Sequence, residues 1–210
     1  MNRAKLCICG LLAAFAMLAA EASAASATVQ WSGSLTGPKM EVEVTGTTEP
    51  LVFKAGTLTV KCSGIKMFKA IVELSTLHSE AEALEFTGCK AEGSSKCELV
   101  ETTIKTGAVK DELVENGSII ADAFEPKSGS TFVTIKLKKS ESCALPASLA
   151  ITGHATGTID KTAKEAETEQ NEHSLIFTLE SGSSLKYEKE SVTLTGAAKG
   201  AIKEGGTYSA

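Results

Sequence analysis

MEVEVTG (residues 40–46) alternates apolar and polar side chains without a break, which is typical of a β-strand with one buried face. The next segment, LVFKAGTLTVKC (51–62), predicts two strands that turn, or one strand that bulges, at Gly56. About ten such short strands at nearly regular spacing predict an all-β fold, a single-domain β-sandwich of antiparallel strands. The remaining strand candidates are 83–89, 102–107, 117–124, 130–138, 148–159, 173–180, 184–189 and 191–202.

Two segments have some helical character. STLHSEAEAL (75–84) begins with Ser and Thr and continues with good helix formers, which predicts two helical turns. KTAKEAETEQNE (161–172) is polar all round, which indicates a solvated loop or a frayed helix. No linker or shift of composition divides the chain, so residues 28–210 are predicted to form one domain.

Residues 1–27 have the plan of a signal peptide. A basic start is followed by an apolar run from Leu6 to Ala20 and by small residues that offer cleavage after Ala24 or Ala27. The apolar run is too short for a stable membrane anchor. We therefore expect a secreted, extracellular protein, free or associated with the cell surface, that has no membrane span after cleavage.

The exported chain is acidic. Of the 21 basic and 26 acidic residues in the sequence, Arg3, Lys5 and Glu21 leave with the signal peptide, so 19 and 25 remain and the formal charge is −6. Affinity for nucleic acids depends on cations that neutralise phosphates, and the chain has no basic run. We therefore expect no nucleic acid as partner, and an unidentified protein or a component of the cell envelope instead.

Four cysteines remain after the signal peptide, and an even number in an exported chain predicts two disulfides. Closeness in sequence favours Cys89–Cys97, around the tip of FTGCKAEGSSKC (86–97), which leaves Cys62 and Cys143 to join distant strands. The spacing of these cysteines matches neither a structural zinc site nor a C-x-x-C redox pair. We therefore expect no metal and no cofactor.

No catalytic motif is present: the sequence has no G-x-S-x-G, no Walker A and no G-x-G-x-x-G pattern. A dispersed hydrolase site would require His154, in a strand rich in Gly and Ala, or another histidine close to Ser and Asp. Trp31 and Tyr208 lie near the two ends of the exported chain and are expected to be exposed. Either Trp31 or Tyr187, beside a concave face, would be needed to bind a sugar or small ligand.

Two segments of the sequence are similar to each other. SLAITGHATGTID (148–160) and SVTLTGAAKGAIK (191–203) align without gaps at an offset of 43 and share six identical residues. Small residues within a strand mark a bulge, a bend or a close backbone approach. The similarity indicates a duplicated unit or a groove that accepts another backbone, or else two neighbouring strands that pack tightly, or chance in a sequence rich in Gly and Thr; we favour the last two.

The order of the cysteine segments resembles a known group of proteins. LTVKC (58–62), LEFTGC (84–89), KC (96–97), the single Cys143 and ITGHATGTI (151–159) follow one another in this order. This arrangement is similar to that of uncharacterised secreted four-cysteine β-rich proteins of actinobacteria. The resemblance covers about residues 50–160, and ELVETT after Cys97 departs from it. It implies an exported all-β protein and brings no catalytic residues to this chain.

Taken together, these features predict a non-enzymatic secreted or cell-surface protein with a structural or interaction role. The alternative is an extracellular module that binds a sugar or another small ligand. A secreted hydrolase with a dispersed site is the third hypothesis. No catalytic, cofactor-binding or metal-binding residue is assigned.

Overall fold

The computed structural model describes residues 30–210 apart from 35–38, 94–95, 117–118, 180 and 204–206, so the predicted signal peptide lies outside the described residues. In the described part the chain forms nineteen strands and one helical turn, α1 (Ala163–Ala166). The all-β prediction is confirmed. Across the same residues, no helix has the length and apolar character needed to cross a membrane.

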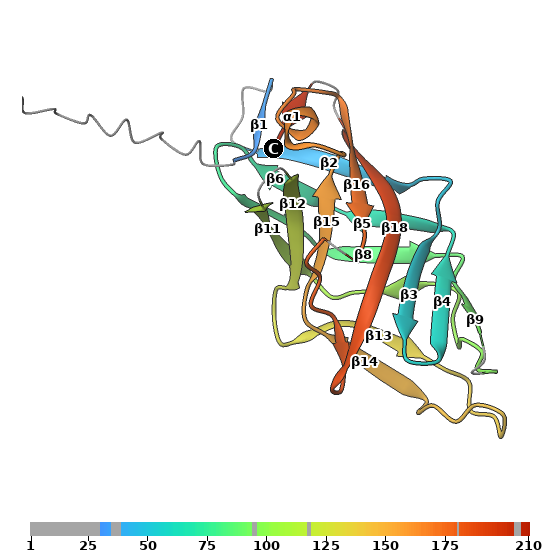
Figure 1. The fold of residues 1–210 in the computed structure, drawn as a ribbon. Coiled ribbons are helices and arrows are strands. Elements are labelled where there is room, and N and C mark those ends of the chain that lie inside the picture. The colour runs from blue at the N-terminus through green and yellow to red at the C-terminus, as the bar shows by residue number, and fades with distance from the viewer. Residues whose placement is uncertain (1–29, 35–38, 94–95, 117–118, 180, 204–206) are drawn as a thin grey trace, which may run out of the picture.

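Eight strands close into a barrel (Figure 1). Each strand pairs antiparallel with two neighbours, in the order β2, β6, β7, β11, β12, β15, β16, β18 and back to β2. Their bounds are β2 Lys39–Gly46, β6 Ala70–Glu73, β7 His78–Ala81, β11 Val109–Asn116, β12 Ile119–Pro126, β15 Ala155–Ile159, β16 Glu172–Phe177 and β18 Glu190–Ile202. The predicted sandwich of about ten strands is therefore wrong, because pairings between segments far apart in sequence close this sheet on itself.

Alternation along the barrel strands separates an inner from an outer face. In β2, Met40, Val42 and Val44 are buried, while Glu41 and Glu43 between them are exposed. A period of two is also seen in β12 and β18, whose buried residues recur mostly at every second position. An eight-stranded barrel has an interior just wide enough for side chains or for one small ligand.

The other strands extend mainly from the end of the barrel opposite α1 (Figure 1). The first half of β18 belongs to a second sheet, in which the strand order is β13, β14, β17, β18, β3, β4, β9. On the other side, β5 pairs with β2, β8 pairs with β5, and β10 pairs with β8. Phe53 of β3 meets Phe86 of β8 edge to face at 4.9 Å, so the two sheets pack together within the same hydrophobic core as the barrel. The bounds are β3 Leu51–Ala55, β4 Leu58–Cys62, β5 Gly64–Phe68, β8 Ala83–Thr87, β9 Lys90–Glu92, β10 Ile104–Lys105, β13 Thr131–Lys136, β14 Ser148–Thr152 and β17 Lys186–Tyr187.

The two similar segments of the sequence lie on either side of β16, as β15 and the second half of β18. Gly153 and Gly196 occupy matching positions, with φ of 100° and 126°, where the chain passes between the barrel and the second sheet. A Cβ on Gly153 would lie 2.3 Å from the carbonyl oxygen of Ser184, and one on Gly196 would lie 2.5 Å from that of Pro50. Both segments therefore need glycine because each meets another backbone of this chain.

Both disulfides are present, but the expected pairing, Cys89–Cys97 and Cys62–Cys143, is wrong. Cys62 is joined to Cys89, and Cys97 to Cys143, with Cα separations of 3.9 and 4.7 Å. Strand pairing explains the first bond, because the β4–β9 ladder ends at Lys61 opposite Lys90 and places the next residues face to face. Leu99 bridges Leu137, and the backbone of Lys138 donates to the carbonyl of Glu98, which brings the segment of Cys97 beside the one that leads to Cys143.

The helix predicted over 75–84 is also wrong, because this segment contains β7 and the start of β8. β7 pairs with β6 on one side and β11 on the other, and these ladders override the helix propensity of its Ala and Glu residues. The polar segment 161–172 does contain one helical turn. Thr162 caps it, since its Oγ1 accepts a hydrogen bond from the backbone of Glu165 at 3.2 Å.

Candidate functional site

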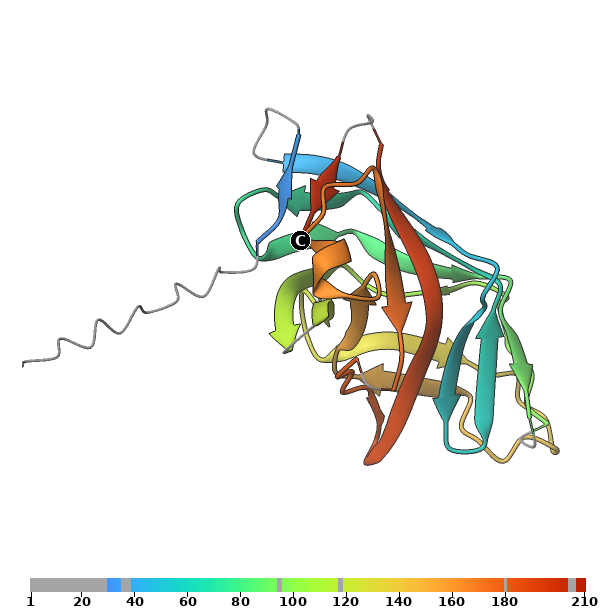
Figure 2. The same ribbon diagram turned by 45° about the horizontal axis from the view of Figure 1, so that its top comes forward.

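Segments from both ends of the described chain cross one end of the barrel (Figures 1 and 2). β1 (Ser32–Gly33) pairs antiparallel with β19 (Tyr208–Ser209), and the backbone of Ala210 donates to the carbonyl of Ala166 in α1 at 2.9 Å. Trp31 directly precedes β1. We call Trp31, β1, α1 and β19 the cap, because together they cover this end of the barrel.

A cavity of about 50 Å³ lies in the barrel beneath the cap. All eight barrel strands contribute to its wall, and Trp31 and Tyr208 contribute from the cap. One part of the wall is apolar, including Val42, Met67 and Phe124. Because one water needs roughly 10–15 Å³ measured in this way, the cavity has room for a few waters or for a ligand of a few heavy atoms.

Ser79, Asp111 and Asp122 form a polar part of the wall, on three consecutive strands of the barrel. Asp111 pairs with Phe124 and Asp122 with Leu113, so the two aspartates are diagonal neighbours on the inner face of β11 and β12. Asp111 is 3 % exposed and Asp122 is 6 % exposed. Two carboxyl groups therefore share a site inside the barrel.

Burial decides the protonation of this pair. Loss of hydration raises the pKa of Asp111, while hydrogen bonds with Asp122 and Ser79 oppose that rise. The pKa of Asp122 is raised well above its usual value, first by burial and then by the charge of Asp111 and their shared hydrogen bond. Asp122 therefore holds the proton and donates it to the carboxylate of Asp111, which also accepts from Ser79 Oγ.

Apart from the hydrogen bond that Asp111 and Asp122 share, three buried polar atoms on this cavity lack a hydrogen-bond partner among the described residues: Trp31 Nε1, Asp111 Oδ1 and Asp122 Oδ1. They are the whole set of such side-chain atoms in the described part of the chain. A buried polar group without a partner is costly, and most native proteins provide one. The concentration of all three atoms on one cavity marks it as the candidate functional site.

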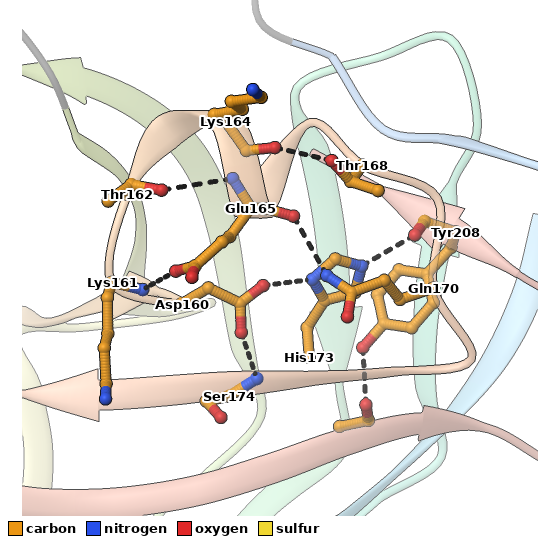
Figure 3. Close-up of polar contacts among 11 residues, drawn as sticks. Asp160, Lys161, Thr162, Lys164, Glu165, Thr168, Gln170, His173, Ser174 and Tyr208 are labelled. Carbon is orange, nitrogen blue, oxygen red and sulfur yellow. Dashed lines mark hydrogen bonds and ion pairs between the residues drawn. The ribbon is translucent and has the colours of Figure 1, made fainter.

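A histidine–aspartate pair connects the barrel wall to the cap (Figure 3). His173 Nδ1 contacts Asp160 Oδ2 at 2.5 Å, and its Nε2 donates to the carbonyl of Tyr208 at 2.6 Å. Asp160 also accepts from the backbone of Ser174 at 2.8 Å. Both ring nitrogens face acceptors and are therefore already used, one in the contact with Asp160 and the other in holding the cap.

The aromatic residues of the cap are packed rather than exposed, which corrects the expectation for Trp31 and Tyr208. Their ring centroids are 6.1 Å apart, and the Tyr208 ring meets His173 edge to face at 4.5 Å. Tyr208 Oη donates to the carbonyl of Gly200 at 2.7 Å, and burial raises the pKa of this phenol. A Cβ on Gly200 would lie 2.9 Å from Tyr208 Oη, so the glycine makes room for the ring.

The predicted hydrolase residue, His154, lies away from the cavity, between β14 and β15. Its Nε2 donates to the carbonyl of Gly182 at 3.2 Å, so its Nδ1 accepts from Ser184 Oγ at 2.9 Å. His154 contacts a serine and His173 contacts a carboxylate. Among the described residues, no single histidine forms hydrogen bonds with both, as a hydrolase site would need. Tyr187 does not line the cavity either.

The residues of the cavity were missed in the sequence, although a signal was present. In segments 109–113 and 120–124, every second residue is apolar except the middle one, which is an aspartate. Such a residue points inward, where an unpartnered charge is expensive. In the part of the chain that the structure describes, no group of three or more His, Cys, Asp or Glu side chains is placed to hold a metal ion.

Comparison of the chain with protein-family models, with curated proteins and with solved structures found no match in any of the three. The resemblance to secreted four-cysteine proteins of actinobacteria therefore stays a prediction. The properties of the site must be argued from its own residues.

Proposed function

We propose that this protein is a non-enzymatic, secreted binding protein whose barrel holds a small polar ligand beneath the cap. The observation that carries the proposal is the convergence of three buried, unpartnered polar atoms on one cavity. A ligand that supplies partners to these atoms would recover the hydrogen bonds that burial costs them. The apolar wall would pack against the rest of the ligand, as in other small-molecule sites.

The arrangement of the histidines supports a binding role over a catalytic one. Nucleophilic catalysis needs a nucleophile and a base in contact, with a third group that orients the base. His154 forms a hydrogen bond with Ser184, but its other nitrogen contacts a backbone carbonyl and not a carboxylate. His173 uses both of its nitrogens in contacts with Asp160 and the backbone of Tyr208. The proposed function therefore assigns no residue to a reaction.

Secretion is proposed on the basis of the N-terminal sequence, and two disulfides are compatible with it because such bonds persist in oxidising compartments. A structural or interaction role at the cell surface remains the second proposal from the sequence. The large hydrophobic side chains exposed in the described part of the chain lie in four separate segments of the sequence. These residues are Phe68, Val100, Val114 and Leu179.

The proposal is tested by titrating the purified, oxidised protein with a panel of small polyols, amides, amines and carboxylic acids. Trp31 is the only tryptophan of the chain and lies on the cavity, so its fluorescence reports binding directly. A ligand of the cavity is expected to change this signal saturably and to raise the unfolding temperature with concentration, because it binds the folded state alone.

A cavity-filling variant makes the test specific. Ala70→Val adds two methyl groups to the cavity wall and is expected to abolish binding. Ala201→Val adds the same atoms next to Gly200 in β18, at a position that does not line the cavity, and is expected to leave binding unchanged. If no compound of the panel binds, or if both variants bind equally well, the proposed function is wrong.

A further inference from the structure

We infer that the ligand of the barrel cavity is a small primary ammonium compound, whose charged group lies between Asp111 and Asp122. This assignment rests on the proposed function and names its ligand class. It follows from three properties of the cavity: its charge, the hydrogen-bonding character of its unpartnered atoms and its size.

The cavity wall supplies no cation for its two carboxyl groups. Burial raises the pKa of Asp122 further than that of Asp111, so Asp111 ionises first and its charge is the one that a ligand would meet. No lysine or arginine is among the residues that line the cavity. His173 does line it, but its Nδ1 already contacts the carboxyl group of Asp160. A buried charge is tolerated when it is paired, and a monocation would pair this one.

The unpartnered atoms of the aspartates are both acceptors. Ser79 Oγ donates to Asp111 Oδ2, and apart from the hydrogen bond between the two carboxyl groups, Oδ1 of each aspartate has no partner among the described residues. A primary ammonium has three N–H donors and can reach two acceptors at once. A hydroxyl or ether cannot supply two donors, and a carboxylate would add a second negative charge.

The third unpartnered atom, Trp31 Nε1, is a donor and requires an acceptor. A hydroxyl group on a short carbon chain would provide it, so an amino alcohol such as ethanolamine satisfies all three atoms in one molecule. The cavity of about 50 Å³ admits only a few heavy atoms, which excludes sugars and nucleosides. The methylene groups of such a ligand would contact Met67 and Phe124 in the apolar wall.

The test uses the oxidised protein labelled with ¹⁵N, in which the single indole N–H of Trp31 gives one resolved NMR signal. The protein is titrated with ethanolamine and ethylammonium, with ethylene glycol and ethanol as neutral compounds of similar size, with glycolate as an anion, and with potassium as a bare cation. We expect saturable shifts of the Trp31 signal with the two ammonium compounds, and binding of ethanolamine tighter than that of ethylammonium.

Matched variants locate the charge that is recognised. Asp111→Asn is expected to weaken ethanolamine binding by about 10- to 100-fold, the loss typical of a hydrogen bond to a charged group. Glu112→Gln removes the same charge from the next residue of β11, which is exposed, and is expected to leave the affinity unchanged. Asp122→Asn keeps the charge of Asp111 and a donor toward it, so binding is expected to persist in this variant.

The outcomes separate the ligand class from the binding function. If the neutral compounds or glycolate bind as well as ethanolamine, or if only potassium binds, the ammonium assignment is wrong while the cavity remains a binding site. Equal affinities of Asp111→Asn and Glu112→Gln would also overturn the assignment. If no compound shifts the Trp31 signal, the ammonium assignment and the proposed function both fail.

Discussion

Asp111 and Asp122 lie diagonally across the β11–β12 ladder and share a hydrogen bond inside the barrel. A strand pair with this geometry brings two carboxyl groups together at a depth where neither is solvated. The barrel therefore keeps a proton on the pair that the unfolded chain would release. This difference links the stability of the fold to pH.

The first prediction concerns that link. The pKa values of both aspartates are raised from 3.8 on folding, so above about pH 4 the native state binds more protons than the unfolded state. The contribution of the pair to the free energy of unfolding is therefore largest near pH 4 and is lost as the pH rises through the folded pKa values. Each unit of pKa difference corresponds to about 1.4 kcal/mol.

Asp122→Asn isolates this contribution, because an amide donates to Asp111 but does not ionise. We expect the variant to be more stable than the wild type at pH 8, by on the order of 1–3 kcal/mol, and to gain less or nothing at pH 5. Urea unfolding from pH 5 to pH 8 measures both. Glu80 and His78, the other charged neighbours of Asp111, are common to both proteins. A variant that is less stable than the wild type at pH 8 would contradict the prediction.

The second prediction concerns the pair that holds the cap. Asp160→Asn removes the carboxylate from His173, and we expect a loss of about 1.5–3 kcal/mol in the free energy of unfolding, as for a buried hydrogen bond to a charged group. Glu172→Gln, one residue before His173, breaks only the exposed ion pair with Lys199 and should cost less than about 1 kcal/mol. Equal losses in urea unfolding would show that the His173–Asp160 pair does not stabilise the cap.

The strands predicted over 40–62 are confirmed because alternation and a glycine turn are local signals. Closure of the barrel was not predictable in the same way. β11 reads VKDELVEN, and its charged residues hide the period of two that Val109 and Leu113 carry. β7 was not predicted as a strand, because its segment is rich in residues that favour a helix. The ring is completed where β7 meets β11 and β18 meets β2, and such long-range pairings are not encoded in any single segment.

Some residues of the candidate site could be predicted from local sequence patterns, whereas others depend on contacts between distant segments. An aspartate in the apolar phase of 109–113 and of 120–124 was visible in the sequence, and it predicts an inward carboxyl group once both segments are recognised as strands. The contact of His173 with Asp160 depends on the loop that carries α1. The position of Trp31 depends on β1 pairing with the C-terminal strand β19. Neither relationship has a sequence pattern of its own.

The third prediction concerns the disulfides. Peptide mapping of the unreduced protein by mass spectrometry should find Cys62 joined to Cys89 and Cys97 joined to Cys143. Replacing either pair by alanine should cost about 3–4 kcal/mol, because the bonds close segments of 27 and 46 residues in the unfolded chain. A Cys89–Cys97 peptide in the native protein would contradict the strand register that places Cys89 opposite Cys62.

The fourth prediction concerns the kink at Gly196, where β18 leaves the second sheet and enters the barrel. Its φ of 126° is unfavourable for any other residue, and a Cβ would lie 2.5 Å from the carbonyl oxygen of Pro50 and 2.9 Å from the Cα of Leu51. Gly196→Ala therefore combines backbone strain with a clash against main-chain atoms that belong to β3 and the residue before it. We expect a loss of more than about 3 kcal/mol in the free energy of unfolding.

Gly129→Ala is the matched control, because Gly129 has a φ of 72° but nothing lies within 4 Å of a Cβ added there. This variant carries the strain without the clash and should lose only about 1 kcal/mol. Urea unfolding of the two variants under the same conditions separates the two effects. If they lose equal amounts, the close approach of β18 to Pro50 does not constrain the fold, and the glycines shared by the two similar segments would need another explanation.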